Sequence, residues 1–276
     1  MVFTETTLKD PRNTCFHIRE WIPDTKPVAL IFLIHGLSDH GGRFIHFGES
    51  AANNGFIFFA PDLRGNGKSQ GKPGHFNSFG ELLDDIGFLL NHAMEKHQSL
   101  PVILYGQSMG GNLVLSYCLN RKPSVAAVVS SSPWLRLAKP PGAPARILGR
   151  LFSSFMPALS LSNGINADDL THDSLISDAY RNDPLVHGRI TLGTFNIISN
   201  SGESVLEKAG EWTLPLLLLH GSSDKITSHS ASQQFAAACP SGCKFVTYQG
   251  LFHELHNEFE KNEIIKGILE WMKSQK

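Results

Sequence analysis

Short apolar runs alternate with helix-period segments along most of this chain, and that alternation limits the possible folds more than any other feature. Five runs have the length and composition of strands that are buried on both faces: residues 28–34, 56–59, 101–105, 125–129 and 214–219. Apolar residues recur at helical spacing in four further segments: residues 43–53, 79–96, 112–119 and 263–273. Strands that alternate with helices form a mostly parallel sheet wrapped by helices. The sequence therefore predicts an α/β fold.

Two polar stretches and one long interruption complete the expected organisation. Residues 3–8 and 16–21 would suit an antiparallel edge of the sheet. Residues 134–212 show no buried-strand pattern, and helical spacing returns at 146–161 before a polar turn at 162–164. We expect a core domain of residues 1–133 and 213–276, with residues 134–212 as a helical insertion between two strands. The apolar positions of 146–161 are also compatible with ordinary core packing: Ile147, Leu148, Leu151, Phe152, Phe155, Met156 and Leu159.

Charge and cysteine content exclude several classes of protein. The 276 residues carry 24 basic and 25 acidic side chains, a formal net charge of −1, and 41% are hydrophobic. That balance argues against a nucleic-acid-binding protein and against a disordered chain. The four cysteines have neither the spacing of a zinc site nor the density of a disulfide framework. With no signal-like N-terminal segment and no apolar run that could span a bilayer, we expect a cytoplasmic protein with reduced thiols.

The strand expected at 101–105 leads directly into the sequence GQSMGG at residues 106–111, and a helical pattern follows at once. A Gly-x-Ser-x-Gly motif between a strand and a helix is the context of a nucleophile elbow, in which the serine occupies a strained turn. The residues two before and two after the serine must lack side chains so that the strand and the helix can approach. The pattern therefore nominates Ser108 as a nucleophile.

A serine hydroxyl needs a histidine to take its proton, and the histidine needs a carboxylate to orient it. In this fold the carboxylate and then the histidine follow the nucleophile, on loops after later strands. Asp224 follows the expected strand 214–219, and His253 follows the strand-like residues 244–248, with His256 as a close competitor. The remaining candidates precede the nucleophile, lie in the insertion, or fit loops and strand ends: Asp62, Asp168, Asp169, Asp173, Asp183, His35, His75 and His220.

An oxyanion hole requires two backbone N–H groups that point at the developing negative charge. One is expected from Met109, the residue after the nucleophile. The other is expected from Leu37, in the His-Gly-Leu-Ser loop after strand 28–34, because the preceding glycine lets the backbone turn its amide inward.

With these pieces in place, the chain resembles the monoacylglycerol lipase and lysophospholipase branch of the α/β-hydrolases, which are serine aminopeptidase S33-like hydrolases. The resemblance spans nearly the whole chain, and its most specific motifs are HGLSDHGGR (35–43), DLRGNGKS (62–69), GQSMGG (106–111), DPL (183–185), GSSD (221–224) and FHELHNE (252–258). It implies a triad of Ser108, Asp224 and His253, and it makes the insertion a lipid-binding cap. Asp39 stands where family members often carry Glu, and Asn66 stands where His is frequent.

The resemblance also implies a site for a glycerol head group. In similar lipases the matching positions recognise the glycerol hydroxyls, and in this chain they are Asp39, Arg43 and His256. Charged donors and acceptors in a partly closed pocket suit that role. A purely structural alternative stays open, because Arg43 lies four residues after Asp39 and can pair with it across a turn.

We therefore expect a serine hydrolase that cleaves the carboxylic ester of a single-chain lipid, first of all monoacylglycerol to glycerol and fatty acid, through an acyl-enzyme. Ser108 would attack the ester, His253 would act as base and then as acid, and Asp224 would orient His253. No metal or organic cofactor is expected. The apolar insertion fits a mobile lid that contacts lipid surfaces at the periphery of a membrane.

Other functions are compatible with the same residues. A lysophospholipase or a short-chain carboxylesterase would use the same triad, since the triad fixes the reaction and the pocket fixes the substrate. An epoxide hydrolase or a dehalogenase is not expected, because those enzymes carry an aspartate at the elbow. The alternative from another class is a non-catalytic α/β-hydrolase-like binding protein. Such proteins tend to lack a triad member, whereas this chain retains all three.

Overall fold

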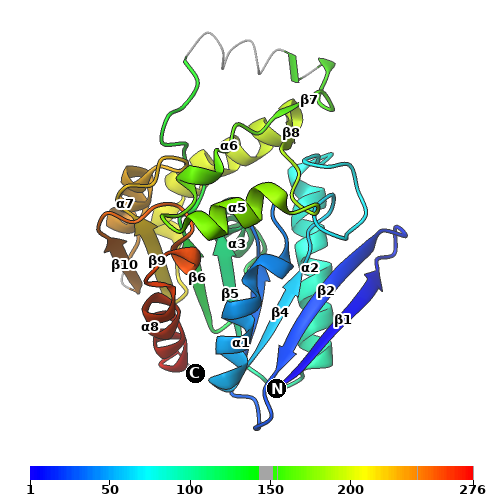
Figure 1. Ribbon diagram of the computed structural model, residues 1–276, viewed down its shortest axis with the longest axis vertical. Coiled ribbons are helices and arrows are strands. Elements are labelled where there is room, and N and C mark those ends of the chain that lie inside the picture. The colour runs from blue at the N-terminus through cyan, green and yellow to red at the C-terminus, as the bar shows by residue number, and fades with distance from the viewer. Residues whose placement is uncertain (143–151, 154, 241, 276) are drawn as a thin grey trace.

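An eight-stranded sheet lies at the centre of the computed structural model, which describes residues 1–142, 152–153, 155–240 and 242–275. In chain order the strands are β1 (Val2–Lys9), β2 (Cys15–Ile22), β3 (Ala29–Ile34), β4 (Phe56–Pro61), β5 (Val102–Gln107), β6 (Ala127–Ser131), β9 (Leu216–Gly221) and β10 (Cys243–Tyr248). Their order in space is β1-β2-β4-β3-β5-β6-β9-β10. Neighbours from β4 to β10 are parallel, whereas β2 is antiparallel to both β1 and β4 (Figure 1). The predicted parallel sheet with an antiparallel N-terminal edge is confirmed.

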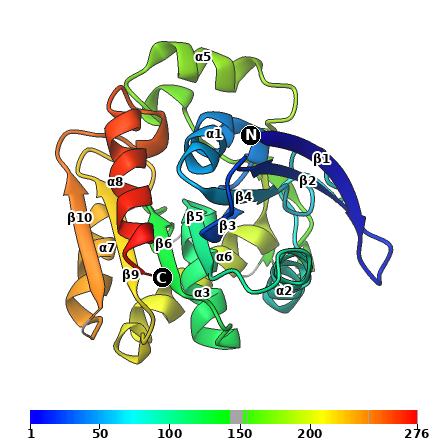
Figure 2. The same ribbon diagram turned by 90° about the horizontal axis from the view of Figure 1, so that it is seen from below.

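Helices cover both faces of this sheet (Figure 2). One face carries α1 (Ile45–Asn53) and α8 (Lys261–Lys273). The other face carries α2 (Phe79–Lys96), α3 (Met109–Arg121), α6 (Leu192–Glu207) and α7 (His229–Ala238). The described residues also form short 3-10 helices: η1 (Gly41–Phe44), η2 (Ala167–Asp169), η3 (Ala209–Glu211) and η4 (Leu255–Asn257). In the described part of the chain, no helix has the length and apolar content needed to cross a membrane.

The central strands are apolar throughout because their side chains alternate between two buried layers. In β3, Leu30 and Phe32 belong to the layer that also contains the apolar side chains of α2 and α3. Ile31 and Leu33 belong to the layer formed with α1 and α8. All six residues of β3 are buried. A strand that is covered on both faces has no position for a solvated side chain, which is why such runs are visible in the sequence.

The chain between β6 and β9 departs from the sequence prediction. Of the helix predicted at 146–161, residues 146–151 and 154 lie outside the described residues. The helix does not continue to residue 161, because Ser160–Ser162 form β7, which pairs antiparallel with β8 (Arg189–Thr191). Pro157 explains the difference, since proline removes a helical hydrogen bond and disfavours helical geometry in the residue before it. The apolar residues keep helical spacing through this proline, so the pattern hid the break.

The same segment contains α5 (Ser174–Asn182) and α6, which lie at the end of the sheet away from both chain termini (Figure 1). A buried polar network ties α6 to α3. Asn112 of α3 donates through Nδ2 to the carbonyls of Trp134 at 2.7 Å and of Ile198 at 3.1 Å. Its Oδ1 accepts the hydroxyls of Ser116 at 2.9 Å and of Ser201 at 2.7 Å. Both donors and both lone pairs of the amide are used, which fixes α6 against the helix that follows the elbow.

Replacing Asn112 with Ala should lower the free energy of unfolding by about 3 kcal/mol, because four hydrogen bonds are lost in a fully buried site. Denaturant unfolding followed by circular dichroism measures this change. Asn120→Ala is the matched control, since Asn120 lies on the same helix and, within the described structure, its side-chain amide donates one hydrogen bond, to the Ser116 carbonyl. Asn120→Ala should lower the free energy of unfolding by about 0.5 kcal/mol. Equal losses in the two variants would contradict the proposed anchoring of α6.

Candidate active site

Ser108 occupies the turn between β5 and α3, at the carboxyl ends of the parallel strands. Its backbone has φ 58° and ψ −118°, a conformation that residues with a Cβ rarely adopt. The Ser108 N–H donates to the carbonyl of Ser131 in β6 at 2.9 Å. Its own carbonyl accepts the N–H groups of Trp134 and Asn112. The strained turn is therefore held in place by the surrounding backbone, as strain at functional sites usually is.

Two glycines allow this turn to form. A Cβ on Gly110 would lie 1.8 Å from the carbonyl oxygen of Ile34, and a Cβ on Gly106 would lie 2.2 Å from the carbonyl oxygen of Gly110. Both distances are far shorter than a non-bonded contact. The prediction that the residues two before and two after Ser108 must lack side chains is confirmed.

Asp224 and His253 meet at the ends of the last two strands. Asp224 follows β9, His253 follows β10, and Nδ1 of His253 lies 2.7 Å from Oδ2 of Asp224. Both side chains are buried. A carboxylate at Nδ1 selects the tautomer in which Nε2 carries no proton, so Nε2 can accept one. Burial lowers the pKa of His253, but the charge and hydrogen bond of Asp224 outweigh burial, and the pKa is raised above its usual value.

Five donors surround the Asp224 carboxylate. The backbone N–H groups of Ile226 and Thr227 donate to Oδ1 at 2.8 and 3.0 Å. Oδ2 accepts the Thr227 hydroxyl at 2.8 Å, and it also lies 3.1 Å from Nε2 of His220. Burial alone would raise the pKa of Asp224, but the charge of His253 and the hydrogen bonds from His220 and His253 hold it far below its usual value. Asp224 therefore remains ionised at neutral pH.

Ser108 lines a cavity that is also bordered by Thr227, a neighbour of Asp224 and His253. Ser108 and Thr227 both line a cavity of about 320 Å³, and Oγ1 of Thr227 lies 3.3 Å from Nδ1 of His253. Within the described residues, no hydrogen bond joins Oγ of Ser108 to His253. Rotation about the single Cα–Cβ bond of Ser108 moves this hydroxyl without moving the backbone. The structure thus places Asp224 and His253 in contact, with Ser108 facing the adjoining cavity.

The two predicted oxyanion donors lie beside Ser108. Met109 is the first residue of α3, so its N–H has no partner within the helix. Leu37 follows Gly36, where a Cβ would lie 3.3 Å from Cβ of Ser108. Among the described residues, neither N–H donates a hydrogen bond. Two free N–H groups next to one serine are what stabilisation of an oxyanion requires.

Arg43 is the centre of a buried ion cluster. Its guanidinium donates two hydrogen bonds of 2.7 Å to the two oxygens of Glu254, and it lies 3.2 Å from Oδ1 of Asp39. Burial lowers the pKa of Arg43, but the charges of Glu254 and Asp39 raise it further than burial lowers it. Burial raises the pKa of Glu254, and the charge of Arg43 brings it down to about 2. The Asp39–Arg43 pair of the structural alternative is present, although Glu254 is the stronger partner.

Asp39 and His256 each keep one buried polar atom without a partner. Oδ1 of Asp39 accepts the His40 N–H at 2.7 Å, whereas Oδ2 has no partner among the described residues. The His256 ring stacks on Phe44, with ring centroids 4.4 Å apart, and its Nδ1 is also without a partner there. Burial lowers the pKa of His256 to about 3, so the ring is neutral. In the described structure, Asp39, Arg43 and His256 are not among the residues that line the cavity at Ser108.

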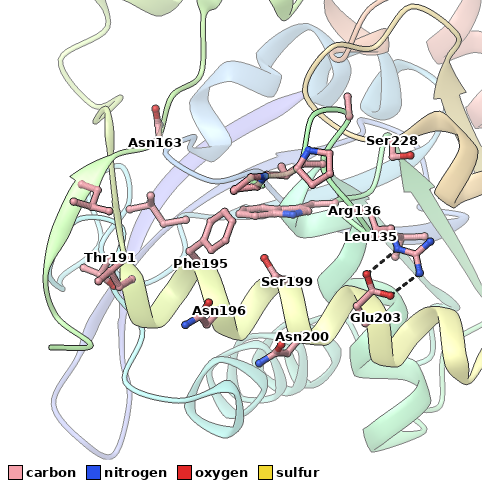
Figure 3. A pocket seen from close by; sticks show the side chains of 18 of the residues that line it. Leu135, Arg136, Asn163, Thr191, Phe195, Asn196, Ser199, Asn200, Glu203 and Ser228 are labelled. Atoms are coloured by element: carbon pink, nitrogen blue, oxygen red, sulfur yellow. Dashed lines mark hydrogen bonds and ion pairs between the residues drawn. The ribbon is translucent and has the colours of Figure 1, made fainter. Parts of the chain in front are cut away.

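A larger and mainly apolar cavity adjoins the one at Ser108. It has a volume of about 590 Å³ and lies between residues 134–141 and α6 (Figure 3). Five residues line both cavities: Trp134, Leu137, Asn163, Ile190 and Phe195. The rings of Trp134 and Phe195 lie 5.7 Å apart at this shared boundary. A ligand whose polar end reaches Ser108 can therefore place an apolar portion in the larger cavity.

Sequence reasoning gave no role to three residues that the structure places at the site. Glu254 binds Arg43, while His220 and Thr227 contact Asp224. Only their proximity in sequence to His253 and Asp224 could have indicated them. Within the described residues, no group of three or more His, Cys, Asp or Glu side chains is arranged to hold a metal ion.

The chain is similar to known hydrolases and lipases in both sequence and structure. Residues 25–260 match the family described as serine aminopeptidase S33. The chain is 36% identical to an uncharacterized abhydrolase domain-containing protein of Dictyostelium discoideum over 94% of this chain, which spans 28% of that protein's length. It is 31% identical to a monoacylglycerol lipase of Mycolicibacterium smegmatis, covering 92% of this chain and 91% of that protein. Among solved structures, a Paleococcus ferrophilus monoacylglycerol lipase superposes over all of both chains with a TM-score of 0.83 and 26% identity.

Gly110→Ala should lower the free energy of unfolding by more than about 3 kcal/mol, because the new methyl group would overlap the Ile34 carbonyl and force β3 and α3 apart. Gly267→Ala is the control, since Gly267 lies in α8 with open space around its Cα. That substitution should raise the free energy by about 0.5 to 1 kcal/mol through helix propensity. Thermal and denaturant unfolding measure both. A stable, wild-type-like Gly110→Ala protein would show that the elbow does not need this close approach.

Proposed function

The chain belongs to the serine aminopeptidase S33 family of α/β-hydrolases, and we propose that it is a carboxylic ester hydrolase that cleaves monoacylglycerol to glycerol and fatty acid. Two similar proteins that match nearly the whole chain, from Mycolicibacterium smegmatis and Paleococcus ferrophilus, are monoacylglycerol lipases. The observation that carries the proposal is the 2.7 Å contact between Asp224 and His253 beside a cavity that Ser108 lines from a strained elbow.

The proposed reaction proceeds through an acyl-enzyme. Oγ of Ser108 bonds to the ester carbonyl carbon while Nε2 of His253 takes the serine proton. The negative charge moves to the carbonyl oxygen, where the N–H groups of Leu37 and Met109 stabilise it. When the tetrahedral intermediate collapses, the glycerol oxygen leaves with the proton from His253. A water molecule then attacks the acyl-enzyme in the same way and releases the fatty acid.

The apolar cavity supports a lipid acyl chain as the occupant. Ionised and strongly polar groups would be costly to desolvate there, whereas an alkyl chain gains from burial. Residues of the segment 134–212 supply most of its lining, including Trp134, Ile190 and Phe195. We accordingly assign residues 134–212 as the cap domain, and residues 1–133 and 213–276 as the hydrolase core.

The exposed apolar side chains of the cap support contact with a lipid surface. Phe155 is 84% exposed, and Phe152 and Met156 are 53% and 49% exposed. Large apolar groups that project together into solvent generally mark an interaction surface. A peripheral position at a lipid–water boundary would cover them and would present lipid substrate to the cavity below.

Head-group selection is the finer part of the proposal. We assign recognition of the glycerol hydroxyls to Asp39, Arg43 and His256. The free Oδ2 of Asp39 and the free Nδ1 of His256 support this assignment, because buried polar atoms of this kind usually have a partner. Arg43 forms ion pairs with both Asp39 and Glu254, and it would act mainly by holding Asp39 in place. A lysophospholipase would need the same triad but a different set of head-group contacts.

Ser108→Ala should reduce hydrolysis of monoacylglycerol by about a millionfold and abolish labelling by a fluorophosphonate, because the atom that forms the acyl-enzyme is removed. Circular dichroism checks that the fold is kept. Ser132→Ala is the control: Ser132 is buried beside the same strand ends, and its hydroxyl has no partner among the described residues. That variant should label and turn over as the wild type does. Wild-type turnover by Ser108→Ala would refute the proposed function. A non-catalytic binding protein would not be labelled even with Ser108 present.

Asp39→Asn should lower kcat/KM for monoacylglycerol about tenfold while leaving a short nitrophenyl ester unaffected, since that ester has no glycerol. Asparagine keeps the size of the side chain and still accepts a hydrogen bond from Arg43. Arg43→Ala is less informative, because it would leave the buried charge of Glu254 uncompensated. Comparing kcat/KM for both esters in wild type and variant decides the matter. A parallel loss on both esters, or no loss on either, rules out Asp39 as a glycerol ligand.

A further inference from the structure

A second histidine lies on the carboxylate that holds His253. His220 stands at the end of β9, and its side chain is fully buried. Its Nε2 lies 3.1 Å from Oδ2 of Asp224, the same oxygen that His253 contacts at 2.7 Å. The proposed mechanism gives no task to this histidine, although it reaches the triad directly.

The two histidines extend from Asp224 in different directions. His253 belongs to the proposed triad, and Thr227, whose Oγ1 lies 3.3 Å from its Nδ1, lines the cavity at Ser108. His220 leads into the protein, where its Nδ1 lies 2.8 Å from the hydroxyl of Ser232 in α7. Ser232 is fully buried within a helix, so it offers no path for a substrate. The second arm is therefore a support for the carboxylate.

The Asp224 carboxylate favours the His220 tautomer that carries its proton on Nε2, because an ionised carboxylate only accepts hydrogen bonds. The hydroxyl of Ser232 can donate to Nδ1, which leaves Nε2 protonated and able to donate to Asp224. Oδ2 of Asp224 then accepts from three donors, because the Thr227 hydroxyl also lies 2.8 Å away. A carboxylate oxygen offers about two lone-pair sites. The donors must share it, and each one reduces the negative charge available to the others.

We propose that His220 is a positioning residue that shares Oδ2 of Asp224 with His253, and that this sharing limits how strongly Asp224 holds a proton on His253. The inference rests on the proposed roles of Ser108, Asp224 and His253. It goes beyond them by naming a residue that sets the basicity of the triad histidine from the far side of the carboxylate.

The sign of the effect follows from the groups that surround the pair. Asp224 faces both His220 and His253 from the loop after β9. His229 of α7 faces His220, with ring centroids 5.5 Å apart. Glu254 and Asp39 add negative charge near His253. Lys225 lies 3.1 Å from Asp169, and both residues line the cavity at Ser108. If His220 loses its N–H, the full charge of Oδ2 acts on His253, and the pKa of His253 rises. His253 must be neutral to accept a proton, so activity is then lost at a higher pH.

The test is the rate of fluorophosphonate labelling as a function of pH, which reports activation of Ser108 without a head group or a lipid surface. His220→Leu should label about tenfold more slowly than wild type at pH 6 and within about threefold of wild type at pH 8.5. His220→Gln keeps an N–H donor and should restore the wild-type profile. With a short nitrophenyl ester, kcat should follow the same pattern and KM should stay unchanged, because His220 does not border the cavity at Ser108 in the described structure.

Two further variants keep the test decisive if His220→Leu folds poorly. Ser232→Ala removes the hydroxyl that fixes the His220 tautomer. The labelling rate of this variant should begin to fall at a higher pH than in wild type, but by a smaller shift than in His220→Leu. His229→Leu is the matched control, since His229 touches the His220 ring but bonds to Thr247. It should leave the profile as in wild type.

The outcomes separate the two claims. The role of His220 is overturned if the pH at which labelling falls is unchanged or lower in both His220→Leu and Ser232→Ala. It is also overturned if His220→Gln behaves like His220→Leu. If these variants do not show the expected pH shifts while Ser108→Ala still abolishes labelling, only the proposed role of His220 is refuted. If Ser108→Ala labels normally, the proposed function itself fails.

Discussion

The close approach of β3, β5 and α3 around Ser108 is the constraint on which the rest of the site depends. Glycine at residues 106 and 110 permits backbone distances that any side chain would prevent, and Ser108 adopts a positive φ as a result. Because β6 and Trp134 bond to the elbow, the sheet fixes the position of the serine. Asp224 and His253 come from β9 and β10, the next two strands beyond β6, so the same sheet also sets their separation from Ser108. Rigid elements hold a reactive constellation more accurately than free loops do.

Several buried charges lie at this edge of the sheet, and Asp224 and Glu254 each have their own partners. Asp224 is surrounded by five donors, and Glu254 is held by both arms of the Arg43 guanidinium. A charge removed from water is tolerated only when neighbouring groups replace the lost hydration. The edge of the sheet therefore combines a strongly polar interior with an apolar cavity directly beside it. This contrast suits a reaction that develops charge at one end of a mostly apolar molecule.

The features that could be predicted from the sequence are those set by local pattern. The helix predicted at 79–96 has those bounds in the structure, where Ser78 accepts the N–H of Glu81 at its start. Asp224 and His253 were selected from chain order, and they lie in contact. The bond between Arg43 and Glu254 joins residues 211 positions apart, and no periodicity indicates such a pairing. Likewise, nothing in the spacing of the 13 histidines indicates that His220 also turns toward Asp224, because that depends on rotamers set by tertiary packing.

The segment between β6 and β9 divides into two physically different parts, and this division bears on how a lipid would be selected. α6 is fixed to α3 through Asn112, and it carries Phe195 at the boundary of the two cavities. The described residues 152–153 and 155–162 include exposed apolar side chains. Their hydrogen bonds to α6 include those from Asn196 to Ser153 at 2.6 Å and from the Gly193 N–H to the Pro157 carbonyl at 2.9 Å. The buried hydrogen bonds of Asn112 hold α6, and with it the inner wall of the larger cavity, against α3. The outer residues instead present Phe152, Phe155 and Met156 to solvent, where contact with a lipid surface would remove apolar area from water. Under the proposed function, α6 would therefore select the acyl chain by shape, and the exposed side chains of Phe152, Phe155 and Met156 would contact the lipid surface.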